Sequence, residues 1–226
     1  MKKLGNIFTA ICVGVIFLLA GLCQAQTAPY TIGVVVDLTG RQSNLGVGNK
    51  RGLDIAIESI NAEGGVNGRK LKAIVNDSES DTAKGVISTK RLIEVDKAVV
   101  LAGYSSSATA LSCIQTIEAG KIPMFASAPA DKIWKPTKKW VFNVVPRQKE
   151  ASIPILLRNL QQRGAKKIAY IYIDTAYGQT GKATLDEVCK EKNITPAIVE
   201  KYAPGSTDAG PQITHIKAAG ADGLLI

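Results

Sequence analysis

Residues 31–40 read TIGVVVDLTG, and this stretch indicates the fold of the chain. Its first six residues form a short apolar run, and the last four are polar or turn-forming. A strand without polar alternation is typical of a parallel sheet whose two faces are both covered by helices. Downstream, Leu53, Ala56, Ile57 and Ile60 recur at helical spacing before a pair of glycines. The stretch therefore predicts a buried strand followed by a crossover helix.

The same unit recurs along the chain. The predicted strands are residues 31–36, 70–76, 98–102, 122–126, 140–145, 167–173, 196–201 and 223–226. The main predicted helices after the first are residues 107–119, 151–163, 180–192 and 210–219. Strands that alternate with helices predict an α/β fold with parallel sheets. We place a boundary near Val145, which divides a first lobe (residues 26–145) from a second (residues 146–226) that ends on a strand and is expected to be incomplete.

The charge of the chain is basic but dispersed. Among 226 residues, 28 Lys and Arg outnumber 19 Asp and Glu, for a net charge of +9. The basic residues are interleaved with acids, and only Lys135 to Lys139 approach a cluster. A nucleic-acid-binding protein concentrates its charge on one face or helix. We therefore expect a solvated surface and no nucleic-acid partner.

The first 25 residues have the pattern of a secretory signal peptide. Met1-Lys2-Lys3 is basic, residues 7–22 are almost entirely apolar, and Cys23-Gln24-Ala25 offers small residues for cleavage after Ala25. The apolar run is shorter than the ~20 residues that a membrane span needs. A lipid anchor at Cys23 is the alternative, disfavoured because Leu22 stands where a small residue is expected. Both readings predict export, and we expect a periplasmic protein.

Outside this segment the chain has two cysteines, Cys113 and Cys189. An oxidising compartment would allow them to form a disulfide. Because they fall in the two different predicted lobes, we expect two free, buried thiols instead.

Ligand-binding residues are expected just after the strands, because ligands of open α/β sheets lie beyond the carboxyl ends of the strands. The strand-end segments are 37–40, 104–107, 127–130 and 174–178. Ser105, Ser106 and Ser107 link a strand to a helix whose first N–H groups lack partners, a place suited to a carboxylate. The alternative is that these serines only cap the helix.

The sequence gives little support to nucleotide binding, hydrolysis or metal binding. The Gly46 to Arg51 segment lacks the third glycine of a dinucleotide motif, and the Gly178 to Lys182 segment is too short for a phosphate loop. His215 is the single histidine and no nucleophile elbow accompanies it, so a hydrolase remains only a rival hypothesis. No cluster of His, Cys and carboxylate residues has metal-ligand spacing. We expect a non-enzymatic protein without metal or cofactor.

Several stretches together resemble the leucine/isoleucine/valine-binding type of periplasmic receptor for ABC transporters. They are IGVVVDLTG at 32–40, Gly46, residues 52–56, INAEGGVNGRKL at 60–71, SSSAT at 105–109 and AYG at 176–178. The resemblance covers residues 30–226. It implies two Rossmann-like lobes that close over a small ligand, a type I periplasmic-binding fold of which this chain would hold a C-terminally truncated part.

The resemblance also implies site residues. Ser106 matches the serine that binds the ligand carboxylate, and Tyr177 matches the second-lobe tyrosine that closes on the ligand. Leu45 stands where many members have an aromatic pocket residue, and Ala128 matches a backbone contact. Tyr104, Ser105 and Ser107 complete the expected ligand-binding loop.

Two departures affect the expected ligand. Ala130 stands where amino-acid receptors of this type usually carry Thr, and the family's acidic ammonium partner would lie beyond Ile226. Ser80 and Ser105 replace a disulfide of some members. We expect the monomeric substrate-binding component of an ABC transporter, which delivers branched-chain or other small amino acids to an inner-membrane permease. The alternatives are a receptor for aromatic carboxylates or amides, and a ligand-sensing domain of a signalling system.

Overall fold

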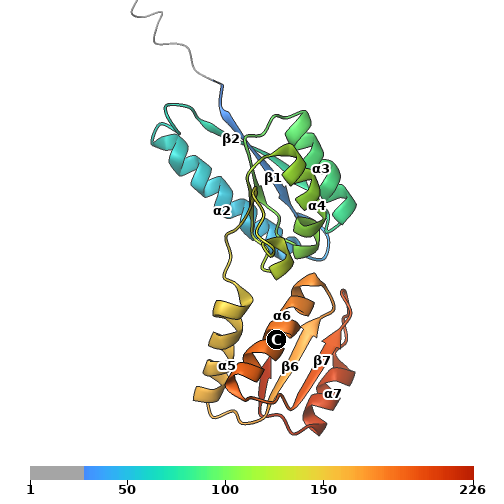
Figure 1. Cartoon of the computed structure of the whole chain (residues 1–226). Coiled ribbons are helices and arrows are strands. Elements are labelled where there is room, and N and C mark those ends of the chain that lie inside the picture. Colours follow the sequence, from blue (N-terminus) through green and yellow to red (C-terminus); the bar gives the residue numbers. More distant parts are fainter. Residues whose placement is uncertain (1–27) are drawn as a thin grey trace, which may run out of the picture.

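A computed structural model describes residues 28–226. The expected signal peptide and Cys23 lie outside this range. The described part divides into two α/β units, each built on its own parallel sheet (Figure 1). None of its helices combines the length and the apolar character that crossing a membrane requires.

The first sheet has five parallel strands in the order β2-β1-β3-β4-β5. The strands are β1 (Tyr30–Val36), β2 (Leu71–Asp77), β3 (Val100–Gly103), β4 (Met124–Ala126) and β5 (Val141–Asn143). Its helices are α2 (Ser43–Ala62), α3 (Thr82–Glu94) and α4 (Ser107–Gly120), with a 3₁₀ turn at Asp131–Ile133. Figure 1 shows α2 on one side of this sheet and the paired α3 and α4 on the other. The sheet is therefore doubly wound, as the sequence predicts.

The second sheet has three parallel strands in the order β7-β6-β8. The strands are β6 (Ile168–Ile173), β7 (Ile198–Tyr202) and β8 (Gly223–Leu225), and the helices are α5 (Ile153–Gln162), α6 (Ala176–Lys192) and α7 (Gly210–Ala218). Successive residues of β6 point to opposite faces, as in any strand. Ile168 and Tyr170 pack with α5 and α6, whereas Ala169 and Ile171 pack with α7. Both faces of β6 are thus covered, which explains its uninterrupted apolar sequence.

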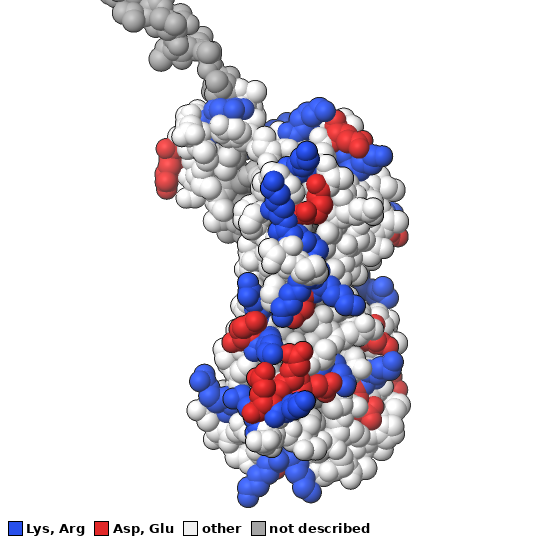
Figure 2. Space-filling view, in the orientation of Figure 1, with Lys and Arg blue, Asp and Glu red and all other residues white. Residues whose placement is uncertain are grey.

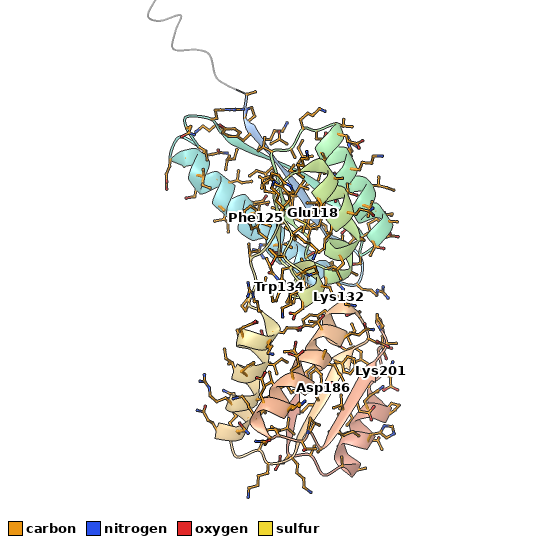
Figure 3. All side chains as sticks on the ribbon, viewed as in Figure 1. Glu118, Phe125, Lys132, Trp134, Asp186 and Lys201 are labelled. Carbon is orange, nitrogen blue, oxygen red and sulfur yellow. The ribbon has the colours of Figure 1, made fainter. Side chains whose placement is uncertain are left out.

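A single described connection joins the two units, between β5 and α5. After β5, Asn143 donates from Nδ2 to the Ala128 carbonyl and accepts from the Val145 N–H. The chain then enters a π-helical turn, Gln148–Ser152, before α5. The Arg147 guanidinium lies 4.2 Å from the ring centroid of Trp134, which anchors the connection to the first unit. Figure 3 shows Trp134 and Lys132 at the end of the first unit nearest the second.

Helix α6 begins at Ala176, four residues earlier than the sequence predicts near Thr180. Thr175 is its N-cap, because its side chain accepts from the Gly178 N–H. Gly178 makes this early start possible, since a β-carbon there would lie 1.9 Å from the Ile173 carbonyl oxygen. The tertiary contact, and not helical periodicity, decides where the helix begins.

Both described cysteines are buried free thiols, Cys113 in α4 and Cys189 in α6. They belong to the cores of different units. Burial raises the pKa of each thiol, which suits two packing residues.

Truncation of Leu101 tests the first core. Leu101 on β3 is fully buried, and Leu→Ala changes in such positions cost about 2–5 kcal/mol through lost contacts and a cavity. Leu101→Ala should lower the free energy of unfolding in urea by that amount. Ile87→Ala is the control, because Ile87 is 68% exposed and surface changes cost about 0.5 kcal/mol or less. Equal effects of the two variants would contradict the assigned core.

Tyr170 gives the second unit a measurable pH dependence. Burial raises the pKa of Tyr170 from 10.0 to about 12. Because the fold favours the neutral phenol, this contribution to stability is complete below pH 10.0 and is lost as the pH rises toward about 12. Tyr170→Phe should therefore make the urea midpoint fall less steeply across this interval. An unchanged slope would show that the phenol ionises in the fold as it does in the unfolded chain.

Candidate ligand-binding site

A cavity of about 600 Å³ lies between the two units, where the carboxyl ends of strands from both sheets face each other. The first unit contributes residues that follow β1, β3 and β4, and the second contributes the ends of β6 and β7. The lining residues are Gln42, Asn44, Leu45, Asn49, Ser105, Ser106, Ser107, Ala108, Ser127, Pro129, Val145, Pro146, Gln148, Ser152, Ile173, Thr175, Tyr177 and Tyr202. The volume suits a small organic molecule.

The geometry of the serine loop is compatible with both of the roles that the sequence left open. Ser106 is the N-cap of α4, and its Oγ accepts from the Thr109 N–H at 3.5 Å. Because the oxygen acts there as an acceptor, its O–H remains a donor for a group in the cavity. The N–H groups of Ser107 and Ala108 belong to the first turn of α4, where no intrahelical carbonyl reaches them. Capping and anion binding are thus compatible at Ser106.

Of the two neighbouring serines, Ser105 has its hydroxyl fully used by the protein and Ser107 does not. Ser105 Oγ donates to Asp37 Oδ2 at 2.8 Å and accepts from the Asp37 N–H at 3.2 Å. Ser107 Oγ accepts from the Ala130 N–H at 3.4 Å. The Ser105 hydroxyl thus positions the loop, whereas Ser106 and Ser107 each keep an O–H that can donate to a group in the cavity.

Asp37 is the centre of this arrangement. It is 1% exposed, and its Oδ1 accepts from Ser78 Oγ at 2.7 Å and from the Ser80 N–H at 3.1 Å. A buried carboxylate needs such partners to offset its lost hydration. Asp37 therefore connects the ends of β1, β2 and β3 immediately behind the cavity.

Two of the expected site residues lie behind the cavity wall. Tyr104 is fully buried, and its hydroxyl lies 2.9 Å from Thr89 Oγ1 in the core. Its positive φ of 50° turns the side chain away from the serine loop. Ala128 is also fully buried, and its carbonyl already accepts from Asn143. Neither Tyr104 nor Ala128 lines the cavity, whereas Leu45 and Tyr177 both do.

The second unit closes the cavity from the opposite side. Tyr177 lies in the first turn of α6 and is 46% exposed, and Tyr202 ends β7. Gln148 and Ser152 enter from the π-helical turn. Outside the cavity, Arg41 Nη1 donates to the Pro204 carbonyl at 3.5 Å, so the two units touch across its mouth.

Sequence reasoning found part of this lining. Ser127 and Thr175 fall in the strand-end segments, and Tyr202 could have been found by the same rule. The start of α2 and its N-cap contribute Gln42, Asn44 and Asn49. The sequence pattern indicated this helix only from Leu53 onward, so these residues were not predicted. Gln148 and Ser152 depend on a π-helical turn, for which periodicity offers no signal.

The site is electrically neutral in its side chains. None of the described residues that line the cavity is Asp, Glu, Lys, Arg or His. Charged side chains of both signs lie on the outer surface, interleaved over the face that Figure 2 shows. The N-termini of α4 and α6, which both lie at the cavity, are then sources of positive potential in it.

Neither a metal-ligand cluster nor a histidine lies among the described residues of the cavity. Within residues 28–226, no group of His, Cys, Asp and Glu has the geometry to hold a metal ion. His215 is exposed on α7, with Nδ1 3.0 Å from Glu200 Oε1, and it does not line the cavity.

The Asp37 arrangement predicts a structural role for Ser105. Ser105→Ala leaves a buried carboxylate oxygen and a buried N–H each without one partner, and such losses cost about 1–3 kcal/mol. We expect the free energy of unfolding in urea to fall by that amount without added ligand. Ser59→Ala on the exposed side of α2 is the control. If the two variants were equally stable, the hydrogen bonds of Ser105 would not hold the loop.

Comparison with known proteins places the chain among solute receptors. A Leu/Ile/Val-binding protein homolog from Brucella suis biovar 1 is 30% identical over 225 residues, which cover 95% of this chain and 56% of the relative. The chain thus spans about half the length of the curated relatives it matches.

Solved structures share the fold. The branched-chain amino acid transporter substrate binding protein LivJ from Streptococcus pneumoniae, in complex with isoleucine, superposes with a TM-score of 0.77 at 21% identity, over 87% of this chain and 56% of that one. A solute binding protein of an ABC transporter from Rhodopseudomonas palustris HaA2, in complex with p-hydroxybenzoic acid, also superposes with a TM-score of 0.77 at 21% identity. This match covers 87% of the present chain and 53% of that one. These likenesses confirm the predicted α/β fold with parallel sheets.

The resemblance expected from the sequence is also confirmed at the level of the family. The model of the periplasmic binding protein family matches residues 29–226. This is a family of binding proteins and not of enzymes. The chain belongs to the periplasmic binding protein family.

Proposed function

We propose that this chain is part of the substrate-binding component of an ABC transporter, which captures a small carboxylate in the periplasm and delivers it to an inner-membrane permease. The observation that carries the proposal is the position of Ser106. It places a hydroxyl and two unpaired first-turn N–H groups of α4 in a cavity between two units. A carboxylate there would receive charge-assisted hydrogen bonds.

Closure of the two units around the ligand is the proposed mechanism. The first lobe, residues 26–145, carries the anion-binding loop, and the second, residues 146–226, carries Tyr177 and Tyr202. Because a single described connection joins them, rotation about residues 144–147 would open and close the cavity. The Arg41 to Pro204 contact is one that opening would break.

We propose a chemical class of ligand and not a single molecule. The Brucella relative is named for leucine, isoleucine and valine, and the two structural neighbours hold isoleucine and p-hydroxybenzoic acid. All of these ligands have a carboxylate. Ala130, where amino-acid receptors of this type usually have Thr, is fully buried and does not line the cavity. We therefore keep amino acids and aromatic carboxylates as the two ligand classes to be tested.

Titration calorimetry with isoleucine, benzoate and 4-hydroxybenzoate tests the proposal. Hydrogen bonds to charged groups contribute about 1.5–3 kcal/mol, and 1.4 kcal/mol corresponds to about tenfold in Kd. Ser106→Ala should therefore weaken binding of the carboxylate that the chain takes by about tenfold or more. The affinity should be retained in Ser106→Thr, which keeps the hydroxyl.

Ser112→Ala is the matched control, because Ser112 lies on the same helix and its hydroxyl donates to the Thr109 carbonyl at 2.8 Å outside the cavity. It should leave the Kd unchanged. If Ser106→Ala and Ser112→Ala bound equally well, the carboxylate would not lie at the serine loop. If none of the three ligands bound to the unmodified chain, this part of the receptor would not capture carboxylates.

A further inference from the structure

Arg147 makes contacts with both units. Its carbonyl accepts from the N–H groups of Ala151 and Ser152 at 3.1 and 3.2 Å, and the residue is the N-cap of the π-helical turn. Its backbone is therefore fixed to the second unit. Its guanidinium, however, lies 4.2 Å from the ring centroid of Trp134 in the first unit. A cation within about 6 Å of an aromatic ring centroid is attracted to the face of the ring.

Trp134 is held by the first unit. Its N–H donates to the Asp131 carbonyl at 3.1 Å, and its side chain packs against the core of that unit. A second cation, Lys135, has its Nζ 4.4 Å from the same ring centroid and 2.8 Å from Asp131 Oδ2. Lys135 and Asp131 would both move with Trp134 if the units rotated. Of the two cations on the ring, Arg147 is the one whose backbone follows the other unit.

The backbone between the two units is free of hydrogen bonds over a very short stretch. The Val144 N–H still donates to the Ala126 carbonyl at 3.1 Å, and the Val145 N–H donates to Asn143 Oδ1 at 2.9 Å. The next backbone hydrogen bonds within residues 28–226 are those on the Arg147 carbonyl. Any hinge in this connection therefore lies between the Val145 N–H and the Arg147 carbonyl.

Pro146 stands in this stretch and limits how it can bend. A proline ring fixes its own φ at about −65°. The residue before a proline is also restricted to an extended conformation. The torsions left to rotate are then mainly ψ of Pro146 and φ of Arg147. Because both precede the Arg147 side chain, rotation about them would carry the guanidinium away from Trp134.

The contact coexists with the enclosed cavity. In the same structure, Arg41 of the first unit reaches the Pro204 carbonyl of the second across the cavity mouth. Neither Arg147 nor Trp134 lines the cavity. Any interaction that is stronger in one arrangement than in another shifts the population toward the first. A contact across the hinge can therefore favour closure without touching the ligand.

We propose that the stacking of Arg147 on Trp134 is a latch across the hinge, which favours the arrangement of the two units seen here over more open ones. Arg147 is thus a positioning residue, because it acts on the distance between the units and not on the ligand. The inference rests on the closure proposed above, but it does not depend on which ligand the cavity takes.

Spin labels on the two units measure this equilibrium without a ligand. Arg51 on α2 and Ala183 on α6 are exposed, so Arg51→Cys and Ala183→Cys would carry the labels, whereas Cys113 and Cys189 are buried. Double electron–electron resonance should resolve the short distance of this arrangement and a longer one. In Arg147→Ala the ratio of short to long should fall about two- to fivefold, as expected for the loss of an exposed cation–π contact.

Two further variants separate the latch from a change of charge. Arg158→Ala removes the same charge from an exposed position on α5 and should leave the ratio unchanged. Trp134→Leu keeps the charge of Arg147 but removes the ring, so it should lower the ratio as Arg147→Ala does. Combining these two changes should lower it no further, because both remove the same contact. The Arg147→Ala result does not depend on the folding of Trp134→Leu, since Arg147 is exposed.

The other outcomes overturn the inference in distinguishable ways. An unchanged ratio in Arg147→Ala would disprove the latch and leave the proposed closure standing where both distances are seen. A higher ratio would show that the contact holds the units apart. An equal fall in Arg158→Ala would assign the effect to charge and not to stacking. If every variant gave one and the same distance with and without isoleucine, benzoate or 4-hydroxybenzoate, the units would not move, and the proposed closure would fail together with the latch.

Discussion

The buried carboxylate of Asp37 is the contact on which the candidate site depends. Through Ser78, Ser80 and Ser105 it joins the segments that follow three neighbouring strands. The start of α2 also packs directly on its backbone, since a β-carbon at Gly46 would lie 2.0 Å from the Asp37 carbonyl oxygen. This contact adds to the backbone pairing of β1 with β3, which extends to Val35 and Gly103 just before the serine loop. The carboxylate thus stabilises the fold and positions the anion-binding groups at the same time.

Among the described residues, the cavity wall carries no charged side chains. The Asp37 carboxylate next to the serine loop is buried behind the wall with its oxygens already paired. The first turn of α4 can then offer N–H groups to an anion without a competing internal carboxylate. On the other side, the N-terminus of α6 and the Gln148 turn contribute polar but neutral groups.

Sequence reasoning was most successful where local pattern and chemistry coincide. The apolar runs marked the strands within a few residues. The strand-end rule brought Ser106, Tyr177 and Ser127 to the cavity. It was less successful with Tyr104, which follows β3 in sequence but whose side chain enters the core. It could not find Gln148, because that residue lies outside any strand end.

The sequence by itself determined the order of strands and helices, their parallel arrangement and the presence of a serine-lined helix start. These features arise from periodicity, composition and capping, which act between residues close in the chain. Only the tertiary structure decided which serine hydroxyls remain available to a ligand and which of them is used by the protein. Those outcomes depend on hydrogen bonds between residues far apart in the chain, such as Asp37 and Ser105. Such contacts follow from strand order and packing, which no local pattern specifies.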